Sequence, residues 1–178
     1  MSRTVTETLM LTVLTALLAG CGLTQSASDA TAATARSIFY KQVKTLHLDF
    51  SARTALNTDG GDMNALSVPT LVRVYQLRDD TAVAQATYDR LLGDDAQLLA
   101  GALLDKRTVV VKPEAGAPLS VPMDKEARFV TVVALFRSPD TRTNSWRLTL
   151  ARADLDPDRP RVIELVDNRL TLRPLAED

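Results

Sequence analysis

Hydrophobic and polar residues alternate along most of the chain from Val43 onward, which is the period of a β-strand with one buried face. In KTLHLDF (44–50), the apolar positions that share one face are Leu46, Leu48 and Phe50. The same period recurs in PTLVRVYQL, KRTVVVKP, ARFVTVVALFR, SWRLTLARAD, PRVIELVD and RLTLRP, with turns such as PEAGAP and DLDPDRP between most of them. The segment 129–136 is almost continuously apolar, so we expect a central strand that is covered on both sides.

One segment departs from this period. TAVAQATYDRLL (81–92) places Val83, Thr87 and Leu91 on one helical face, and Gly93 is positioned to end the helix. The following DDAQLLAGALLD predicts a second short helical turn. Short strands with one helical segment among them predict an all-β fold, a two-sheet antiparallel β-sandwich with a small helical insertion.

The start of the chain has the pattern of a bacterial lipoprotein signal. Arg3 precedes LMLTVLTALLA (9–19), an apolar run that would be about 16 Å long as a helix and is too short to span a bilayer. LAGC (18–21) matches the lipobox of bacterial lipoproteins, in which an aliphatic residue and two small residues precede an obligatory cysteine. The resemblance implies cleavage between Gly20 and Cys21 and acylation of Cys21, the only cysteine. The alternative is an ordinary secreted protein with a chance cysteine.

Gly22 stands where lipoproteins retained at the inner membrane commonly carry Asp, so we expect a lipid anchor in the outer membrane and a domain facing the periplasm. Residues 22–42 begin with a stretch rich in Ser, Ala and Thr without a sustained period. We therefore divide the chain into a signal peptide (1–20), a lipidated cysteine with a flexible tether (21–42) and a β-sandwich domain (43–178). In an alternative interpretation, residues 38–40 join the sandwich as an early strand.

The net charge and the absence of several motifs argue against nucleic-acid binding, catalysis and metal binding. The formal net charge is −1 and the basic residues are scattered, so no nucleic-acid partner is expected. His47 is the only histidine, and no GxSxG accompanies it, which favours an exposed strand residue over a catalytic base. DLDPD (154–158) and NTDGGD (57–62) each lack the Gly and the Glu of a calcium-binding loop at the required positions. We expect no metal, no enzymatic activity and no cofactor other than the covalent lipid on Cys21.

The order of several motifs resembles one bacterial family. A lipobox, PTLVRVYQLRD, a helix containing TYDRLLGDD, and RFVTVVALFR before SWR are together similar to the outer-membrane lipoprotein of the type VI secretion system, the TssJ (SciN) family. The resemblance covers about residues 43–172 and implies a transthyretin-like β-sandwich with an additional helix. It also implies a role in anchoring the membrane core complex, by binding the periplasmic C-terminal region of the inner-membrane TssM protein beside the other subunits of that complex.

In that family the loop between the first two strands contacts TssM, and here the loop corresponds to residues 53–68. Sixteen residues is long for a strand connection, and the apolar residues Leu56, Met63 and Leu66 stand in a largely polar segment. The candidate partner-binding residues are Leu56, Asn57, Asp59, Asp62, Met63, Asn64 and Leu66. Two alternatives remain open: the loop folds its apolar residues back onto the sandwich, or the protein is a periplasmic lipoprotein that binds a small ligand or cell-wall material.

Overall fold

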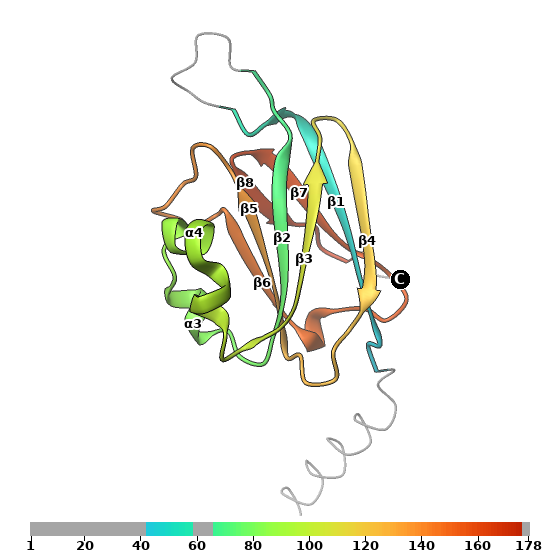
Figure 1. The fold of residues 1–178 in the computed structure, drawn as a ribbon. Helices are drawn as coiled ribbons and strands as arrows, with labels where there is room; N and C mark the ends of the chain where they lie inside the picture. The colour runs from blue at the N-terminus through green and yellow to red at the C-terminus, as the bar shows by residue number, and fades with distance from the viewer. Residues whose placement is uncertain (1–41, 59–65, 176–178) are drawn as a thin grey trace, which may run out of the picture. The chain divides into compact units, whose positions relative to one another are not determined.

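The computed structural model describes residues 42–58 and 66–175, which form two four-stranded sheets, two α-helices and a short 3-10 helix, η1 (Arg152–Asp154) (Figure 1). The first sheet has the strand order β4 (Gly116–Pro122), β1 (Thr45–Leu56), β7 (Arg161–Asp167) and β8 (Arg169–Leu172). The second has the order β3 (Leu103–Val111), β2 (Thr70–Leu77), β5 (Phe129–Leu135) and β6 (Arg147–Ala151). We refer to them as the β1 sheet and the β2 sheet. The predicted two-sheet β-sandwich with a helical insertion is confirmed.

All seven segments predicted as strands form strands, and two features differ from the prediction. Strand β4 lies partly in the segment PEAGAP, which was predicted as a turn, and it contains Pro118 and Pro122. Proline is tolerated there because β4 is the edge strand of its sheet, where a missing N–H breaks no ladder on the free side. The pairing of β1 with β7 is parallel, with Phe50 opposite Ile163, so the sandwich is not purely antiparallel.

The core lies between the sheets, where the alternating apolar residues of both meet. Phe50 and Val132 are fully buried, as is most of β5. Strand β5 is also covered on its other face, because Val133 is the cross-strand partner of Arg73 and Arg147, and both arginines reach helix backbones. The prediction of a central strand covered on both sides is therefore confirmed.

The helical segment has different bounds from those predicted. It consists of α3 (Thr81–Gln85) and α4 (Tyr88–Leu99), separated by extended backbone at 86–87. Gly93 does not end the helix, which continues past a kink at Asp94 (φ −146°, ψ 42°). The expected second helical turn is thus the last part of α4.

Arginines from the β2 sheet hold both helices at these irregular points. Arg147 donates to the carbonyl oxygens of Val83, Ala86 (2.9 Å) and Ala84 (2.7 Å), which satisfies the C-terminal carbonyls of α3. Arg73 donates to the carbonyl oxygen of Leu91 (2.7 Å), just before the kink of α4. The arginines therefore supply hydrogen bonds to backbone carbonyls beside the break after α3 and the kink of α4.

Strand β1 connects the two ends of the sandwich. It begins three residues after Gln42, the first described residue, and it ends at Leu56, where the connection to β2 leaves from the opposite end (Figure 1). Twelve residues at about 3.3 Å each span roughly 40 Å. Chain entry and the β1–β2 connection therefore lie at opposite ends of the domain.

Candidate functional site

The structure separates the predicted partner-binding residues into three groups. Leu56 is the last residue of β1 and is fully buried, and Asn57 after it is 3% exposed. Leu66, on the far side of the connection, is 64% exposed. The other four predicted residues, 59, 62, 63 and 64, lie outside the described part of the chain. The assumption that Leu56 is a loop residue is wrong, because β1 continues through residues 53–56 and its last side chain completes the core.

Asn57 joins three segments at the base of the connection. Its φ is +52°, a left-handed conformation that asparagine tolerates better than most residues. Its side-chain oxygen accepts a hydrogen bond from the Arg137 backbone N–H (2.7 Å), and its amide nitrogen donates to the Pro69 carbonyl (3.4 Å). Its own backbone N–H donates to the Asp167 carbonyl (2.7 Å). A buried asparagine with these contacts positions the connection and does not itself face a partner.

Further hydrogen bonds close the base on both sides. The Ser67 hydroxyl donates to the Thr54 carbonyl (2.6 Å) and accepts from the Leu56 N–H (3.3 Å). The Arg137 guanidinium donates to the carbonyls of Asn57 and Leu66 (3.4 Å each). Both ends of the connection are therefore fixed to the sandwich, while the Leu66 side chain points into solvent.

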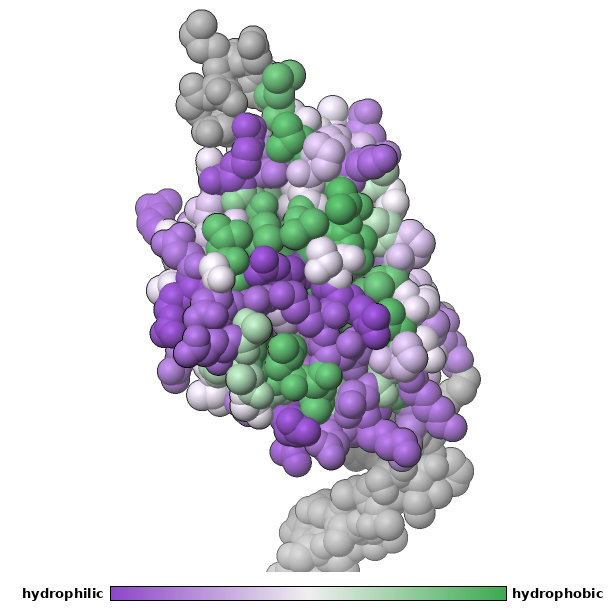
Figure 2. Space-filling view, in the orientation of Figure 1, coloured by the Kyte–Doolittle hydropathy of each residue, from purple (hydrophilic) through white to green (hydrophobic). Residues whose placement is uncertain are grey.

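An apolar row lies on the outer face of the β2 sheet near the same end of the molecule. Leu71 is directly opposite Val110 on β3 and Leu135 on β5, so the three side chains share one face. Leu71 is 37% exposed and Val110 is 54% exposed. Leu92 of α4, 46% exposed, lies at the edge of this row, because Arg73, two residues after Leu71, donates to its carbonyl. Figure 2 shows apolar side chains gathered across this part of the surface.

The apolar row is a candidate binding surface that the sequence pattern did not indicate. The alternation in PTLVRVYQL (69–77) puts Leu71 on the same face as Arg73 and Tyr75, but it does not show that the helices leave Leu71 partly exposed. A signal was nonetheless present, since residues 109–111 are consecutive valines at the end of β3 and one of them has to point outward.

A polar cluster borders the row and fastens α4 to the sheet. The Asp95 carboxylate, almost buried, accepts a hydrogen bond from the Tyr75 hydroxyl (2.6 Å) and forms ion pairs with Lys106 (2.6 Å) and Arg73 (3.3 Å). Burial opposes ionisation of Asp95, but the hydrogen bonds from Lys106 and Tyr75 and the charge of Arg73 outweigh it and lower its pKa. Burial, together with Asp95, raises the pKa of Tyr75. The pair is a fixed carboxylate and a neutral hydroxyl, suited to holding α4 in place.

The residues weighed for catalysis or metal binding have structural surroundings. His47 Nδ1 lies 3.0 Å from Ser120 Oγ on the outer face of the β1 sheet. Asp156 accepts hydrogen bonds from the backbone N–H groups of Asp158 and Arg159 and from the Arg159 side chain, which lowers its pKa to about 2 and defines a turn. Within residues 42–58 and 66–175, no cluster of three or more His, Cys, Asp or Glu side chains could hold a metal ion. No helix in those ranges is both long and apolar enough to cross a bilayer.

Comparison with known proteins gives a family and a set of similar structures. Residues 44–172 match the family model described as "Type VI secretion lipoprotein, VasD, EvfM, TssJ, VC_A0113". A chain of the structure "T6SS protein TssM C-terminal domain (869-1107) from EAEC" is 37% identical, with a TM-score of 0.68, and covers 75% of this chain and 100% of its own length. A chain of a "Type VI membrane complex" is 40% identical at the same coverage, with a TM-score of 0.70.

More distant structures share the fold. The Serratia marcescens protein Lip, described as "a membrane bound component of the Type VI Secretion System", is 23% identical over 75% of this chain and 100% of its own, with a TM-score of 0.65. No curated protein sequence matches. The family model spans well over half of the chain, and it covers all of the ordered motifs except the lipobox. The chain therefore belongs to the type VI secretion lipoprotein family, TssJ (SciN).

Proposed function

We propose that this protein anchors a type VI secretion membrane complex by binding the periplasmic C-terminal region of a TssM-type protein. The main support for the proposal is a structure named for the TssM C-terminal domain, because it contains a chain that is 37% identical to this one. The match covers 75% of this 178-residue chain and the whole of the matched chain. The matched chain is therefore far shorter than the TssM domain for which that structure is named, residues 869–1107. This difference in length supports a lipoprotein subunit held beside TssM in the same structure.

The partner surface that we propose has two parts. One is the β1–β2 connection, with Leu66 and the residues Asp59, Asp62, Met63 and Asn64 expected from the sequence. The other is the apolar row of Leu71, Val110, Leu135 and Leu92. Exposed apolar side chains that are contiguous and bordered by polar groups are typical of protein-binding surfaces. Leu56 and Asn57 act beneath this surface, by fixing the connection to the sandwich.

The anchor that we propose is the lipid on Cys21, with the domain in the periplasm and the acyl chains in the outer membrane. The family comprises lipoproteins of this secretion system, and the lipobox at residues 18–21 supplies the attachment point. Three acyl chains on one cysteine would hold the protein in the membrane essentially permanently. This role needs a lipid and a protein-binding surface and requires no catalytic group, so we propose a non-enzymatic function.

Binding to the periplasmic part of the partner, measured by calorimetry, tests the surface. We expect Val110→Glu and Leu66→Glu each to weaken binding at least tenfold, or about 1.4 kcal/mol, because a carboxylate would be desolvated in an apolar contact. Replacing residues 59–65 with a Gly-Ser linker should weaken binding similarly, because it removes the predicted contact residues of the connection. The domain should stay folded, because the replacement spares the hydrogen-bonded base. Leu175→Glu is the matched control, because Leu175 is as exposed as Leu71 (37%) and lies outside the apolar row.

The outcomes test the binding surface, the identity of the partner and the lipid anchor separately. Unchanged affinity in all three variants, with the fold intact by circular dichroism, would move the contact elsewhere on the domain. If the unmodified protein has no affinity for the partner, the anchoring function itself is wrong. Palmitate labelling of the wild type and of Cys21→Ser, with membrane fractionation, tests the lipid separately, and label in the variant would exclude Cys21 as the attachment point.

A further inference from the structure

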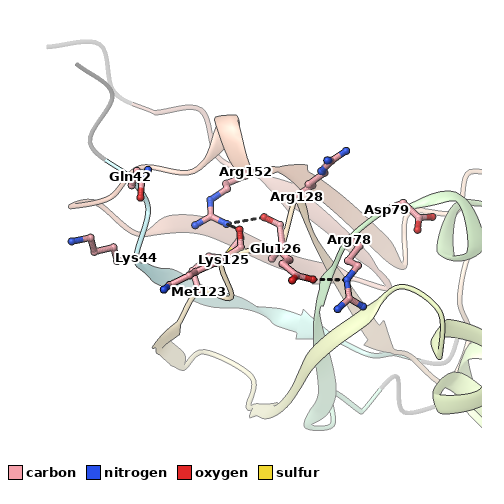
Figure 3. A pocket seen from close by; sticks show the side chains of 10 residues that line it. Gln42, Lys44, Arg78, Asp79, Met123, Lys125, Glu126, Arg128 and Arg152 are labelled. Atoms are coloured by element: carbon pink, nitrogen blue, oxygen red, sulfur yellow. Dashed lines mark hydrogen bonds and ion pairs between the residues drawn. The ribbon is translucent and has the colours of Figure 1, made fainter. Parts of the chain in front are cut away.

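A cavity of about 1090 Å³ lies at the end of the domain opposite the apolar row. Its walls come from the residues that precede β1, the end of β2, the segment between β4 and β5, and the turn after β6 (Figure 3). Five of its lining side chains are basic and two are acidic. This excess of positive charge stands out in a protein whose formal net charge is −1.

Three of the basic side chains have no counter-charge. Lys44, Lys125 and Arg128 are exposed, and within the described part of the chain their side chains make no hydrogen bond or ion pair. Arg78 is paired with Glu126 (2.8 Å), and Figure 3 shows Lys44 and Arg78 on opposite sides of Arg152. Positive charge is therefore spread across the mouth of the cavity, an arrangement that suits several anionic groups side by side.

Arg152, the fifth basic residue, joins the backbone segments that line the cavity. The Arg152 guanidinium donates to the carbonyls of Asp124 (2.8 Å), Ala127 (2.8 Å) and Val43 (2.7 Å), which ties the β4–β5 segment to the start of the domain. The Met123 N–H also donates to the Lys44 carbonyl (2.9 Å). The backbones that carry Lys44 and Lys125 are thus held together before any ligand binds, which lowers the entropic cost of binding.

The cavity also lies where the chain leaves toward its lipid. Gln42 is one of the lining residues, and Cys21 precedes it by only 21 positions in the sequence. A linker of this length reaches at most about 70 Å, so an acyl group on Cys21 would keep the cavity within that distance of a bilayer surface. Tethering raises the effective concentration of membrane groups at the cavity, so contacts that are weak singly become significant.

We propose that this basic cavity binds the phosphates of anionic phospholipid headgroups in the membrane that carries the Cys21 lipid. The inference rests on the lipid anchor of the proposed function. Lys44, Lys125 and Arg128 supply the contacts to phosphate, and Arg152 holds their backbones in place. No lining residue described in the structure is aromatic, so a nucleic acid would find no side chain on which to stack a base.

Energy transfer between the domain and the membrane tests the proposal. The full lipidated protein with Ala153→Cys, beside Arg152 and exposed, is labelled with a donor fluorophore, since Cys21 carries the lipid and the new thiol is then the only free one. It is reconstituted in vesicles of phosphatidylcholine, alone or with about a third phosphatidylglycerol, and a trace of acceptor-labelled lipid. We expect at least twofold higher transfer efficiency with phosphatidylglycerol, reversed at about 0.5 M salt, where charges are screened within a few ångströms.

Charge reversal identifies the residues. The triple variant Lys44→Glu, Lys125→Glu and Arg128→Glu should lose the response to phosphatidylglycerol. The control variant Arg90→Glu, Lys112→Glu and Arg169→Glu changes the net charge equally at exposed positions outside the cavity, and it should keep the response. An equal loss in both variants would overturn the proposal, because the attraction would then depend on net charge alone.

Two further measurements decide between ligands and between proposals. If inorganic phosphate raises the melting temperature at constant ionic strength while phosphatidylglycerol has no effect on energy transfer, the cavity binds a free anion and the membrane proposal is wrong. The triple variant should bind the TssM-type partner with unchanged affinity and incorporate palmitate. Failure of the headgroup response with partner binding and labelling intact would overturn this inference alone, whereas loss of labelling in the wild type would overturn the anchor.

Discussion

Asn57 combines an unusual backbone conformation with a side chain that bridges two other segments. Substitution to Ala removes both side-chain hydrogen bonds and leaves a β-carbon at φ +52°. We expect Asn57→Ala to lower the free energy of unfolding by about 2–3 kcal/mol. Asn57→Gly loses the same hydrogen bonds but tolerates the conformation, so it should be about 1 kcal/mol less destabilising than Ala. Urea unfolding of the three proteins measures both differences.

The comparison of the two Asn57 variants contains its own control. Equal destabilisation by Ala and Gly would show that the left-handed backbone stores no strain. A second readout is binding of the partner to the folded variants, which should weaken because the side chain of residue 57 no longer joins the start of the connection to Arg137 and Pro69. Unchanged binding would mean that the base of the connection is not required for presentation of Leu66.

Asp95 gives stability a defined pH dependence. Its pKa is lowered below the ordinary 3.8 in the folded state, so its contribution is fully present above that value and is lost as the pH falls through the folded-state pKa. Asp95→Asn should therefore be less stable than wild type by about 3 kcal/mol at pH 7, because Lys106 and Arg73 lose their counter-charge. The difference should shrink as the pH approaches 3. A difference that is constant with pH in urea titrations would show that ionisation of Asp95 does not matter.

The residue scale also shows how far the alternation of the sequence could predict the core. Leu46, Leu48 and Phe50 were assigned correctly to the buried face, and all three are buried. Leu56 has the same even-numbered parity and completes that face, but exposed residues at 53–55 obscured the pattern. Continuing the period of two past a polar interruption would have placed Leu56 in the core. Asn57 offered no such signal, since its partners are distant in sequence.

At the scale of elements, Arg147 should control the stability of the helical segment. It is the group that satisfies the last carbonyls of the five-residue helix α3, which has no basic residue of its own in its last turn. Arg147→Lys keeps the charge but cannot span three carbonyls with one ammonium group. We expect amides of residues 83–92 to exchange at least tenfold faster with deuterium, while amides of β1 and β7 keep their rates.

Arg90→Lys is the control for the Arg147 experiment, because Arg90 is an exposed arginine on α4 and, among described residues, its side chain makes no hydrogen bond or ion pair. It should leave exchange in the helices unchanged. Faster exchange across the whole domain in Arg147→Lys would instead indicate that the helices unfold only together with the sandwich. Trp146, which packs edge-on against Tyr88 with ring centroids 5.1 Å apart, is one contact that links the helices to the sandwich.

The elements that the sequence failed to predict share a cause. Strand β4 was mistaken for a turn because its prolines and glycine signal a turn locally, and only its position at a sheet edge makes a strand acceptable. The carbonyls beside the break after α3 and the kink at Asp94 are bound by Arg147 and Arg73, which come from strands elsewhere in the chain. The parallel pairing of β1 with β7 joins segments more than 100 residues apart, and no local period encodes it.

At the scale of the whole molecule, composition concealed the most informative feature. A net charge of −1 and scattered basic residues indicated only that no nucleic-acid partner is expected, yet folding gathers Lys44, Arg78, Lys125, Arg128 and Arg152 around one cavity. These residues come from four separate stretches of the sequence, so their proximity is visible only in three dimensions. The family and the fold, by contrast, were recoverable because motifs and strand periods are local.

The course of β1 has a mechanical consequence for a protein that is proposed to be attached to a membrane at one end and to a partner protein at the other. The strand begins next to the entry of the lipidated segment and ends at the connection proposed to hold the partner. Tension that the partner exerts on this connection would therefore pass along the covalent backbone of one strand. The interstrand hydrogen bonds from β1 to β4 and β7 would bear only the part of the force that is transmitted to the neighbouring strands. A pull applied between residues 42 and 58 should consequently leave the rest of the sandwich folded at forces that would unravel it if applied across its sheets.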